Sequence, residues 1–289
     1  MCYDPQLGDR LFGALGEPTV LDEYGDRWAL ITGASSGIGA AFARKLSALG
    51  MHLVLTARRE DLMRELADEL DTRHGTRTEV IVADLSEGDA PSKLVEEIER
   101  RGIDIELLVN NAGFAIVGDQ EHTDIDRVQA MLQLNVAAVT ELTHRLLRPM
   151  LQRGHGAVIN VSSVTGFQPV AYMGAYAASK AFVLHFSEAL WSEVRDQGVT
   201  VMALCPGATR TSFFEVAGVP GWLKKRSCQD PDRVVRGALK GLEKGRQFWV
   251  SGWKNYLRSL VVRLATRRTV VNESRKYFRP PVVKNPKQD

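Results

Sequence analysis

The chain has 289 residues and a formal net charge of +2, with 44% hydrophobic and 25% charged side chains. This composition supports a sizeable core in one large α/β domain, and the near-neutral charge argues against a protein that mainly binds nucleic acid. Three scattered cysteines (Cys2, Cys205 and Cys228) predict a reducing compartment. The sequence shows no signal-peptide pattern and no apolar run of the roughly 18 residues that span a bilayer. We therefore expect a cytoplasmic protein.

Short apolar runs alternate with helical patterns along most of the chain. The runs have few polar interruptions, which is typical of strands buried on both faces. We expect strands at 28–32, 52–56, 79–83, 107–110, 157–161, 200–204 and 247–250. We expect helices from a glycine-rich turn to 49 and at 60–73, 89–101, 135–152, 174–197 and 231–244. The alternation predicts a doubly wound, Rossmann-like α/β fold whose parallel sheet has seven strands and helices on both faces.

The composition changes at the two ends of the chain but shows no linker between domains. Residues 1–26 are polar and punctuated by glycine and proline, which predicts an N-terminal extension with one helical turn. Residues 27–252 form the expected domain. From Lys254 to the end there are 10 Lys and Arg and 2 Asp and Glu, so residues 253–289 form a basic C-terminal tail.

The first expected strand leads into a glycine-rich turn at residues 32–39, with the spacing G-x-x-x-G-x-G. Glycine lets the backbone approach a pyrophosphate, and the helix that follows presents free N–H groups and the positive end of its dipole. The turn therefore predicts a dinucleotide site. The cofactor contacts expected here are Gly33, Ser35, Ser36, Gly37, Ile38 and Gly39.

Residues 33–37 also match G-x-S-x-G, the nucleophile elbow of α/β-hydrolases. That fold needs an acid and a histidine after the nucleophile, and its elbow normally follows several strands. Here the turn follows the first strand, and the six histidines are scattered. They also lack the paired spacing of metal ligands, so we expect no metal site.

The second expected strand is followed by Arg58 and Arg59, where an acid normally binds the ribose 2′-hydroxyl of NAD. A guanidinium group binds a 2′-phosphate, so Arg58 predicts NADP(H). The alternative is that both arginines are solvated residues before a helix capped by Glu60 or Asp61. Asp84 ends the third strand, where it either reaches the adenine or caps the next helix.

Tyr176 and Lys180 are four residues apart on an expected helix, so their side chains are neighbours. A tyrosine with its ordinary pKa near 10 is a poor acid–base catalyst at neutral pH. We expect the ammonium group, together with the positive nicotinamide of an oxidised cofactor, to favour the phenolate and to lower this pKa by roughly two to three units. Ser163 stands at a strand end, where its hydroxyl either donates to a substrate carbonyl or serves as a helix cap or turn residue.

These motifs together resemble the short-chain dehydrogenase/reductase family, in its single-domain branch. The matching residues cover roughly 27–250 and appear in the family's order. They are residues 32–39, Asn110, Asn111, Ala112, Gly113, Asn135, Ser163, Tyr176, Lys180, Pro206, Gly207 and Thr211.

The resemblance implies a role for each matching residue. Tyr176 is the proton donor or acceptor, Ser163 polarises the substrate oxygen, and Lys180 holds the nicotinamide ribose. Asn135 anchors a water that relays protons to solvent. The implied contacts to the rest of the cofactor are Asn111, Ala112, Gly113, Pro206, Gly207 and Thr211, the last to the carboxamide, and Leu85 and Thr209 complete the set.

The stretch 208–230 is rich in apolar residues and predicts a lid over the nicotinamide. Such a lid suits an apolar ketone, aldehyde or alcohol, although the same residues also suit simple packing onto the core. The expected wall comprises Phe213, Phe214, Val216, Val219, Pro220, Trp222 and Leu223, with Phe114, Phe167 and Met173 beside it.

The tail carries apolar residues at helical spacing among arginines, with Trp253 and Tyr256 leading in. This pattern is typical of a helix on an anionic membrane surface and also of a helix packed on its own domain or a partner subunit. We favour packing. The apolar residues are Leu257, Leu260, Val261 and Leu264, and the arginines are Arg258, Arg263, Arg267 and Arg268.

The leading functional hypothesis is an NADP(H)-dependent carbonyl reductase or alcohol dehydrogenase. One alternative is a membrane-associated reductase of 3-oxoacyl or steroid type, distinguished by the tail. Another is a non-catalytic NADP(H)-binding regulator, although such relatives usually lose the tyrosine or the lysine. The resemblance also implies a homodimer or homotetramer formed through the helices at 135–152 and 174–197.

Overall fold

The computed structural model describes residues 24–219 and 228–279, so most of the N-terminal extension lies outside the described residues. The chain forms one parallel sheet of seven strands in the order β3-β2-β1-β4-β5-β6-β7, which confirms the predicted doubly wound fold. The strands are β1 (Trp28–Thr32), β2 (His52–Ala57), β3 (Thr78–Val82), β4 (Ile105–Asn110), β5 (Gly156–Val161), β6 (Val199–Cys205) and β7 (Phe248–Val250).

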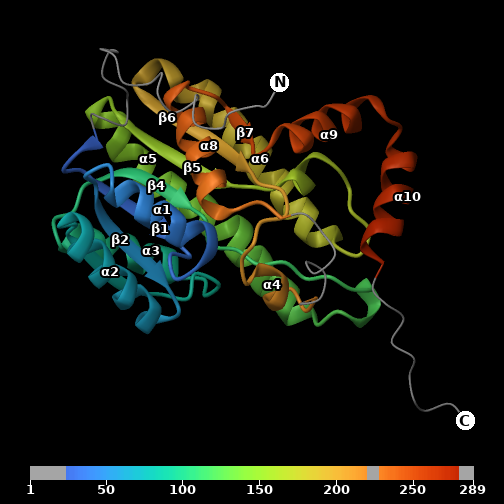
Figure 1. The fold of residues 1–289 in the computed structure, drawn as a ribbon, viewed down its shortest axis with the longest axis horizontal. Coiled ribbons are helices and arrows are strands. Elements are labelled where there is room, and N and C mark those ends of the chain that lie inside the picture. The colour runs from blue at the N-terminus through green and yellow to red at the C-terminus, as the bar shows by residue number, and fades with distance from the viewer. Residues whose placement is uncertain (1–23, 220–227, 280–289) are drawn as a thin grey trace, which may run out of the picture.

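Helices cover both faces of the sheet, while α9 and α10 extend from the β7 edge (Figure 1). The α-helices are α1 (Gly37–Ser47), α2 (Glu60–His74), α3 (Ala90–Arg100), α4 (Ile125–Leu132), α5 (Val139–Arg153), α6 (Gly174–Val194), α7 (Phe213–Val216), α8 (Pro231–Glu243), α9 (Trp253–Leu264) and α10 (Arg267–Phe278). Short helical turns are η2 (Gln120–His122), η3 (Gln133–Ala138), η4 (Val164–Phe167) and η5 (Arg195–Gln197).

The helix predicted at 135–152 begins ten residues earlier, at Ile125. Asp124 caps α4, because its side chain accepts a hydrogen bond from the backbone N–H of Asp126. The π-helical turn η3 then joins α4 to α5. A π-turn changes the helical period, so the apolar pattern on its two sides does not read as one helix in the sequence.

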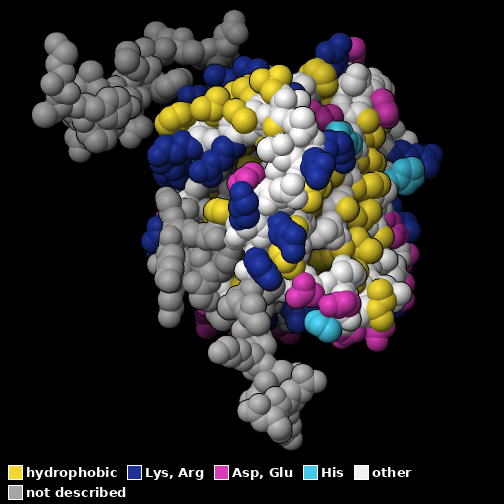
Figure 2. All heavy atoms as spheres, turned by 90° about the vertical axis from the view of Figure 1, so that its right-hand side faces the viewer, with side chains coloured by type: hydrophobic (Ala, Val, Ile, Leu, Met, Phe, Trp, Pro, Cys, Tyr) yellow, Lys and Arg dark blue, Asp and Glu magenta, His cyan; other side chains and the backbone are white. Residues whose placement is uncertain are grey.

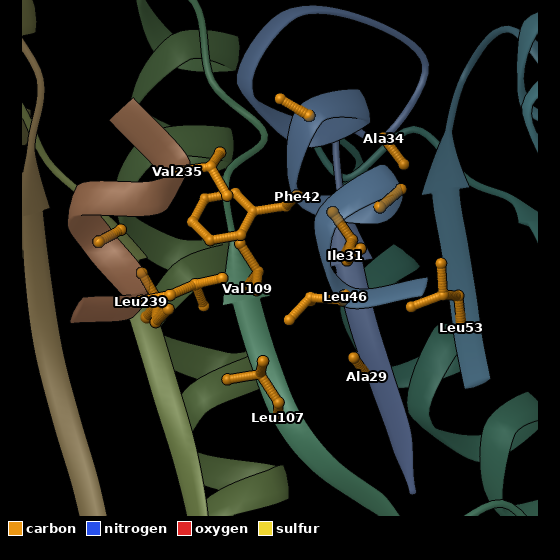
Figure 3. Close-up of a cluster of buried hydrophobic side chains, with 14 of the residues drawn as sticks. Ala29, Ile31, Ala34, Phe42, Leu46, Leu53, Leu107, Val109, Val235 and Leu239 are labelled. Atoms are coloured by element: carbon orange, nitrogen blue, oxygen red, sulfur yellow. The ribbon is translucent and has the colours of Figure 1, made fainter. Parts of the chain in front are cut away.

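The sheet separates two buried clusters because successive side chains of a strand point to opposite faces. In β1, Ala29 and Ile31 enter the cluster under α1 and α8, whereas Leu30 enters the cluster under α3 and α5. On the first side, Phe42 of α1 points toward Val109 of β4 and Val235 of α8 (Figure 3). This packing fixes the start of α1 against the carboxyl ends of β1 and β4, where the strand order reverses and such folds bind ligands.

Truncation of Phe42 tests how far α1 depends on this core. Phe42 is fully buried, so Phe42→Ala is expected to lower the free energy of unfolding by ~3–5 kcal/mol in chemical denaturation. The matched control is Phe182→Ala, whose side chain is 42% exposed, with an expected loss below about 1 kcal/mol. Equal losses in the two variants would contradict this account of the core.

Candidate active site

A cleft of about 1680 Å³ runs along the carboxyl ends of the strands. Its walls bring together residues from distant parts of the sequence, from Gly33 to Phe278. Of the expected cofactor contacts, Gly39 does not line the cleft. Those that line it are Gly33, Ser35, Ser36, Gly37, Ile38, Arg58, Asp84, Leu85, Asn111, Ala112, Gly113, Tyr176, Lys180, Pro206, Gly207, Thr209 and Thr211. Ser163 also lines the cleft, whereas Asn135 lies behind it.

The glycine-rich turn fits against the ends of neighbouring segments only because it lacks side chains. Gly33 has a φ of +66°, and a Cβ there would lie 2.9 Å from the Cα of Ala112. Gly37 has a φ of +59°, and a Cβ there would lie 2.7 Å from Cγ2 of Thr211. Both positions therefore require glycine on conformational and steric grounds.

The segment after β4 anchors this turn through hydrogen bonds. The backbone N–H groups of Asn111 and Ala112 both donate to Oγ1 of Thr32 at 2.9 Å. The Asn111 side chain donates to the carbonyl oxygen of Thr32 at 2.9 Å. At the other end of the turn, Ser36 is the N-cap of α1 but makes no side-chain capping bond. The first N–H groups of α1 thus remain available to an anion.

The Arg59 side chain reaches back to the glycine-rich turn. The sequence analysis chose Arg58 as the residue that binds the phosphate and did not predict this contact of Arg59. Its Nη2 donates to Oγ of Ser35 at 3.0 Å and to Oγ of Ser36 at 2.9 Å. Arg58 instead lies with its Nη1 3.5 Å from Oδ2 of Asp84. The cleft therefore carries two guanidinium groups beside the turn, and the only sequence signal for Arg59 was its place next to Arg58.

Two capping alternatives from the sequence are wrong. The N-cap of α2 is Arg59 rather than Glu60 or Asp61, and the N-cap of α3 is Asp89 rather than Asp84. The Asp84 carboxylate instead accepts from the backbone N–H and the hydroxyl of Ser86, at 3.0 and 2.6 Å. Burial raises the pKa of Asp84, but these bonds and the charge of Arg58 outweigh it and lower the net pKa.

The four expected catalytic side chains are all buried, with exposed fractions from 0% to 8%. Lys180 donates from Nζ to the carbonyl oxygen of Val161 at 2.8 Å, and the same Nζ lies 5.9 Å from the centre of the Tyr176 ring. Ser163 shares a side-chain hydrogen bond with Tyr176. The Phe213 ring lies 5.7 Å from the Tyr176 ring and covers the phenol with apolar surface.

The protein alone does not show the predicted lowering of the Tyr176 pKa, and the part of it attributed to an oxidised nicotinamide stays a prediction. Burial raises the pKa of Tyr176, and the hydrogen bond with Ser163 opposes this only in part. Burial also lowers the pKa of Lys180 to about 8. The sequence placed the two residues side by side but did not reveal that both are removed from water. Burial therefore favours the protonated phenol over the phenolate.

Asn135 holds the backbone that borders Lys180. Its Nδ2 donates to the carbonyl oxygen of Phe114 at 3.0 Å and to Oγ of Ser179 at 3.2 Å, and its Oδ1 accepts from the N–H of Phe114. A Cβ at Gly113 would lie 2.8 Å from this Oδ1 and 3.4 Å from Nζ of Lys180. Asn135 belongs to the π-helical turn η3, and π-turns are frequent at functional sites.

The loop after β6 completes the cofactor side of the cleft. The carbonyl oxygen of Pro206 accepts from the N–H of Val164 at 3.1 Å, and Oγ1 of Thr209 donates to the carbonyl oxygen of Gly207 at 3.0 Å. Thr211 lies against Gly37, and its hydroxyl accepts from the N–H of Phe213 at 3.2 Å. This threonine therefore joins the loop to the glycine-rich turn.

The expected apolar wall is present over the described residues. Val219 packs in the cluster around Tyr176 without lining the cleft, and Pro220, Trp222 and Leu223 lie outside the described residues. The wall residues that line the cleft are Phe114, Phe167, Met173, Phe213, Phe214 and Val216.

Helices α9 and α10 form a further wall that sequence reasoning missed. Asn255 of α9 sits against Gly207, where a Cβ would collide with its side-chain amide. Ser274 of α10 accepts a hydrogen bond from the backbone N–H of Ala171 at 3.0 Å, and Phe278 packs against the cluster around Tyr176. These contacts are long-range and partly polar, so no periodic signal in the sequence marks them.

The hydrolase alternative receives no support from the cleft. None of the six histidines, all of which lie within the described ranges, lines it. The Ser35 hydroxyl, which would be the elbow nucleophile, instead accepts a hydrogen bond from Arg59. A serine bonded to a guanidinium group has no base to take its proton.

The chain shows clear similarity to known oxidoreductases. The sequence profile of the short chain dehydrogenase family matches residues 27–218. A very-long-chain 3-oxoacyl-CoA reductase from Anas platyrhynchos is 33% identical over 73% of this chain and 67% of the relative. The inactive hydroxysteroid dehydrogenase-like protein 1 of Homo sapiens is 32% identical over 73% of this chain and 62% of the relative. A short-chain dehydrogenase from Sphingobium yanoikuyae, solved in complex with NADPH, superimposes with a TM-score of 0.76 and 32% identity over 82% of this chain and 92% of that one.

The fold, the glycine-rich turn and the buried tyrosine–lysine pair define a nucleotide-dependent oxidoreductase of the Rossmann type. The chain belongs to the short-chain dehydrogenase family.

The buried ammonium group of Lys180 predicts a pH-dependent stability. The pKa of Lys180 is about 8 in the folded chain and 10.5 in its ordinary state. Between these values the unfolded chain binds a proton that the folded chain has released, so stability from this group rises with pH. Relative to Lys180→Met, the native free energy of unfolding is expected to rise by ~2 kcal/mol from about pH 7.5 to about pH 9.5.

Chemical denaturation of both proteins at the two pH values measures this difference. Lys45→Met, which removes an exposed lysine at the end of α1, is the matched control. A constant difference between native protein and Lys180→Met across this range would contradict the burial of a charged group at position 180.

Proposed function

We propose that this chain is an NADP(H)-dependent oxidoreductase that interconverts a carbonyl and an alcohol on an apolar substrate. The observation that carries the proposal is the burial of Ser163, Tyr176 and Lys180 together in the cleft that also contains the glycine-rich turn. A turn of this kind alone occurs in many nucleotide-binding proteins. A protonated phenol beside it supplies the proton that carbonyl reduction needs.

The residues of the cleft fit a phosphorylated dinucleotide. Gly33 and Gly37 let the turn lie close against Ala112 and Thr211, where a Cβ would collide, and the N-terminus of α1 attracts phosphate. Arg58 and Arg59 place two positive charges beside the turn, where a carboxylate would repel a 2′-phosphate. These features favour NADP(H), and the solved relative that contains NADPH supports this choice.

The chain's own residues divide the chemistry among them. NADP(H), when bound, supplies or accepts the hydride. Tyr176 donates the proton to the substrate oxygen in reduction and accepts it in oxidation. The Ser163 hydroxyl donates to the same oxygen and polarises it, while the Lys180 ammonium group favours the phenolate that remains after proton transfer.

The shape and lining of the cleft favour a bulky apolar substrate. Phe114, Met173 and Phe213 line it in the cluster that contains Tyr176, and Phe278 of α10 extends the same wall. Phe167 lines the cleft from a separate cluster. Two curated relatives are called a 3-oxoacyl-CoA reductase and a 7beta-hydroxysteroid dehydrogenase. We therefore favour a ketone on a long acyl chain or a fused-ring skeleton within the same reaction class.

A non-catalytic nucleotide-binding protein is the alternative from another functional class. It is supported by similarity to a human relative whose name calls it inactive. The present chain retains a tyrosine, a lysine, a serine and an asparagine at its four expected catalytic positions, and all four are buried together. This retention favours turnover.

We further propose a cytoplasmic homodimer or homotetramer built on α5 and α6, where Phe182 is 42% exposed.

Tyr176→Phe tests the proton donor. The variant is expected to lower kcat for reduction of an apolar ketone by about 10²–10⁴, because the proton must come from elsewhere. The dissociation constant for NADPH is expected to stay within about twofold, since the ring is preserved. Tyr256→Phe, at an exposed tyrosine that does not line the cleft, is the control. Unchanged kcat in Tyr176→Phe would refute the assignment.

Arg58→Ala and Arg59→Ala test the choice of cofactor. Each is expected to weaken NADPH binding about tenfold or more, because a charge-assisted hydrogen bond to phosphate is lost. NADH, which lacks this phosphate, is expected to lose little. Calorimetric titration with both cofactors measures the ratio. Arg64→Ala, which removes an arginine paired with Glu60 on α2, is the control. Equal losses for NADPH and NADH would show that neither arginine recognises the phosphate.

A further inference from the structure

Helix α9 presents its apolar side chains outward. Its inward side is formed by Asn255, Ser259 and Val262, of which Ser259 is 5% exposed. The apolar residues on the other side are 37–89% exposed. They are Trp253, Tyr256, Leu257, Leu260, Val261 and Leu264. The helix packs on its own domain, as one part of the favoured expectation had it, but small polar side chains make that contact and the apolar ones do not. Packing on a partner subunit stays a prediction.

These six residues, termed here the α9 apolar arc, form one continuous strip. At 100° per residue they fall within an arc of roughly 140°. A helix of a soluble domain normally turns such a strip toward the core, and contiguous exposed apolar surface marks an interaction site. The exposed tryptophan and tyrosine at its first turn are residue types that favour membrane–water interfaces.

Positive charge flanks the arc. Lys254 and Arg258 follow one side of the arc by helical spacing. The Arg263 guanidinium group instead lies over the rings of Phe167 and Phe248, 5.8 and 6.0 Å from their centres. Over residues 253–279 there are eight Lys and Arg and one Glu. Figure 2, which faces the side of the molecule that carries α9 and α10, shows hydrophobic side chains along its upper edge with Lys and Arg beneath them. Such a surface is complementary to a negatively charged one.

The arc is continuous with the mouth of the active-site cleft. Trp253 and Val261 belong to the arc and also line the cleft. Lys254 and Arg258 line the cleft on the same side of α9. The exposed apolar strip therefore begins at the rim through which a substrate would enter.

We propose that α9 lies along an anionic membrane surface, with the apolar arc in the interfacial region and neighbouring basic side chains, including the exposed Arg267 and Arg268 at the start of α10, on lipid phosphates. A second copy of the chain is the less suitable occupant, because twofold pairing of α9 would bring two cationic sets together. Within the described residues, no helix is long and apolar enough to cross a bilayer. The contact is thus a surface one. The proposal also includes delivery of the apolar substrate from the bilayer, and this part rests on the proposed function.

Flotation of the full chain with lipid vesicles tests the membrane contact. The probes are vesicles of phosphatidylcholine alone and of equal parts phosphatidylcholine and phosphatidylglycerol. The native protein is expected to bind the mixed vesicles at least about tenfold more tightly than the neutral ones, because several basic residues lie near the surface. No flotation with either vesicle, or equal binding to both, would overturn the proposal.

Two variants separate the apolar contribution from the charge. Leu264→Asp changes a side chain that is 89% exposed and is expected to weaken binding to the mixed vesicles at least about tenfold. Arg267→Gln/Arg268→Gln is expected to weaken it about tenfold while leaving binding to neutral vesicles unchanged. Ile125→Asp makes the same kind of change at a side chain that is 60% exposed on α4 and is expected to have no effect.

Two further measurements distinguish the competing outcomes. If Leu264→Asp shifts the sedimentation coefficient to that of a smaller species while vesicle binding is unchanged, the arc is an interface between copies and the proposal fails. NADPH oxidation with a water-soluble ketone is measured in parallel and is expected to be unchanged in all three variants. If the native protein shows no NADPH oxidation, the proposed function is overturned but the flotation result still holds.

Discussion

The burial of the Lys180 ammonium group is the constraint on which the arrangement of the site depends. The side chain is 4% exposed, and burial lowers its pKa to about 8. A cation removed from water must be fixed by oriented dipoles, and here the carbonyl oxygen of Val161 accepts from Nζ at 2.8 Å. The next residue of that strand end, Ser162, donates to the carbonyl oxygen of Lys180 at 2.7 Å. Helix α6 is thereby joined to β5 from both directions, which holds Tyr176 at the bottom of the cleft.

The features that the sequence predicted are those set by neighbouring residues. Buried parallel strands appear as apolar runs, so the seven strands and their crossovers could be predicted. The φ values of +66° at Gly33 and +59° at Gly37 are conformations that glycine adopts freely, so the turn carries its own signal. Tyr176 and Lys180 are one helical turn apart, which places them side by side in any helix.

The features that escaped prediction depend on contacts between distant segments. Of the two adjacent arginines, Arg59 contacts the glycine-rich turn, because the Ser35 hydroxyl lies where it accepts a hydrogen bond from the Arg59 guanidinium group. The depth of Tyr176, and hence the direction of its pKa shift, follows from Phe213 and α10 closing over it. The wall formed by α9 rests on small polar side chains such as Ser259, and polar contacts of this kind leave no hydrophobic period to detect.

Helix α9 connects the outer surface of the protein to the cofactor side of the cleft by direct contacts. Asn255 donates to the carbonyl oxygen of Ser251 at 2.8 Å and lies against Gly207. Pro206 precedes Gly207, and its carbonyl oxygen accepts a hydrogen bond from the N–H of Val164, the residue after Ser163. The apolar arc, the loop after β6 and the segment that carries Ser163 are therefore parts of one packed unit. If the proposed membrane contact and function hold, an apolar substrate arriving from a lipid surface would first meet Trp253 and Val261, the two arc residues that also line the cleft, and these would reduce the cost of exposing it to water.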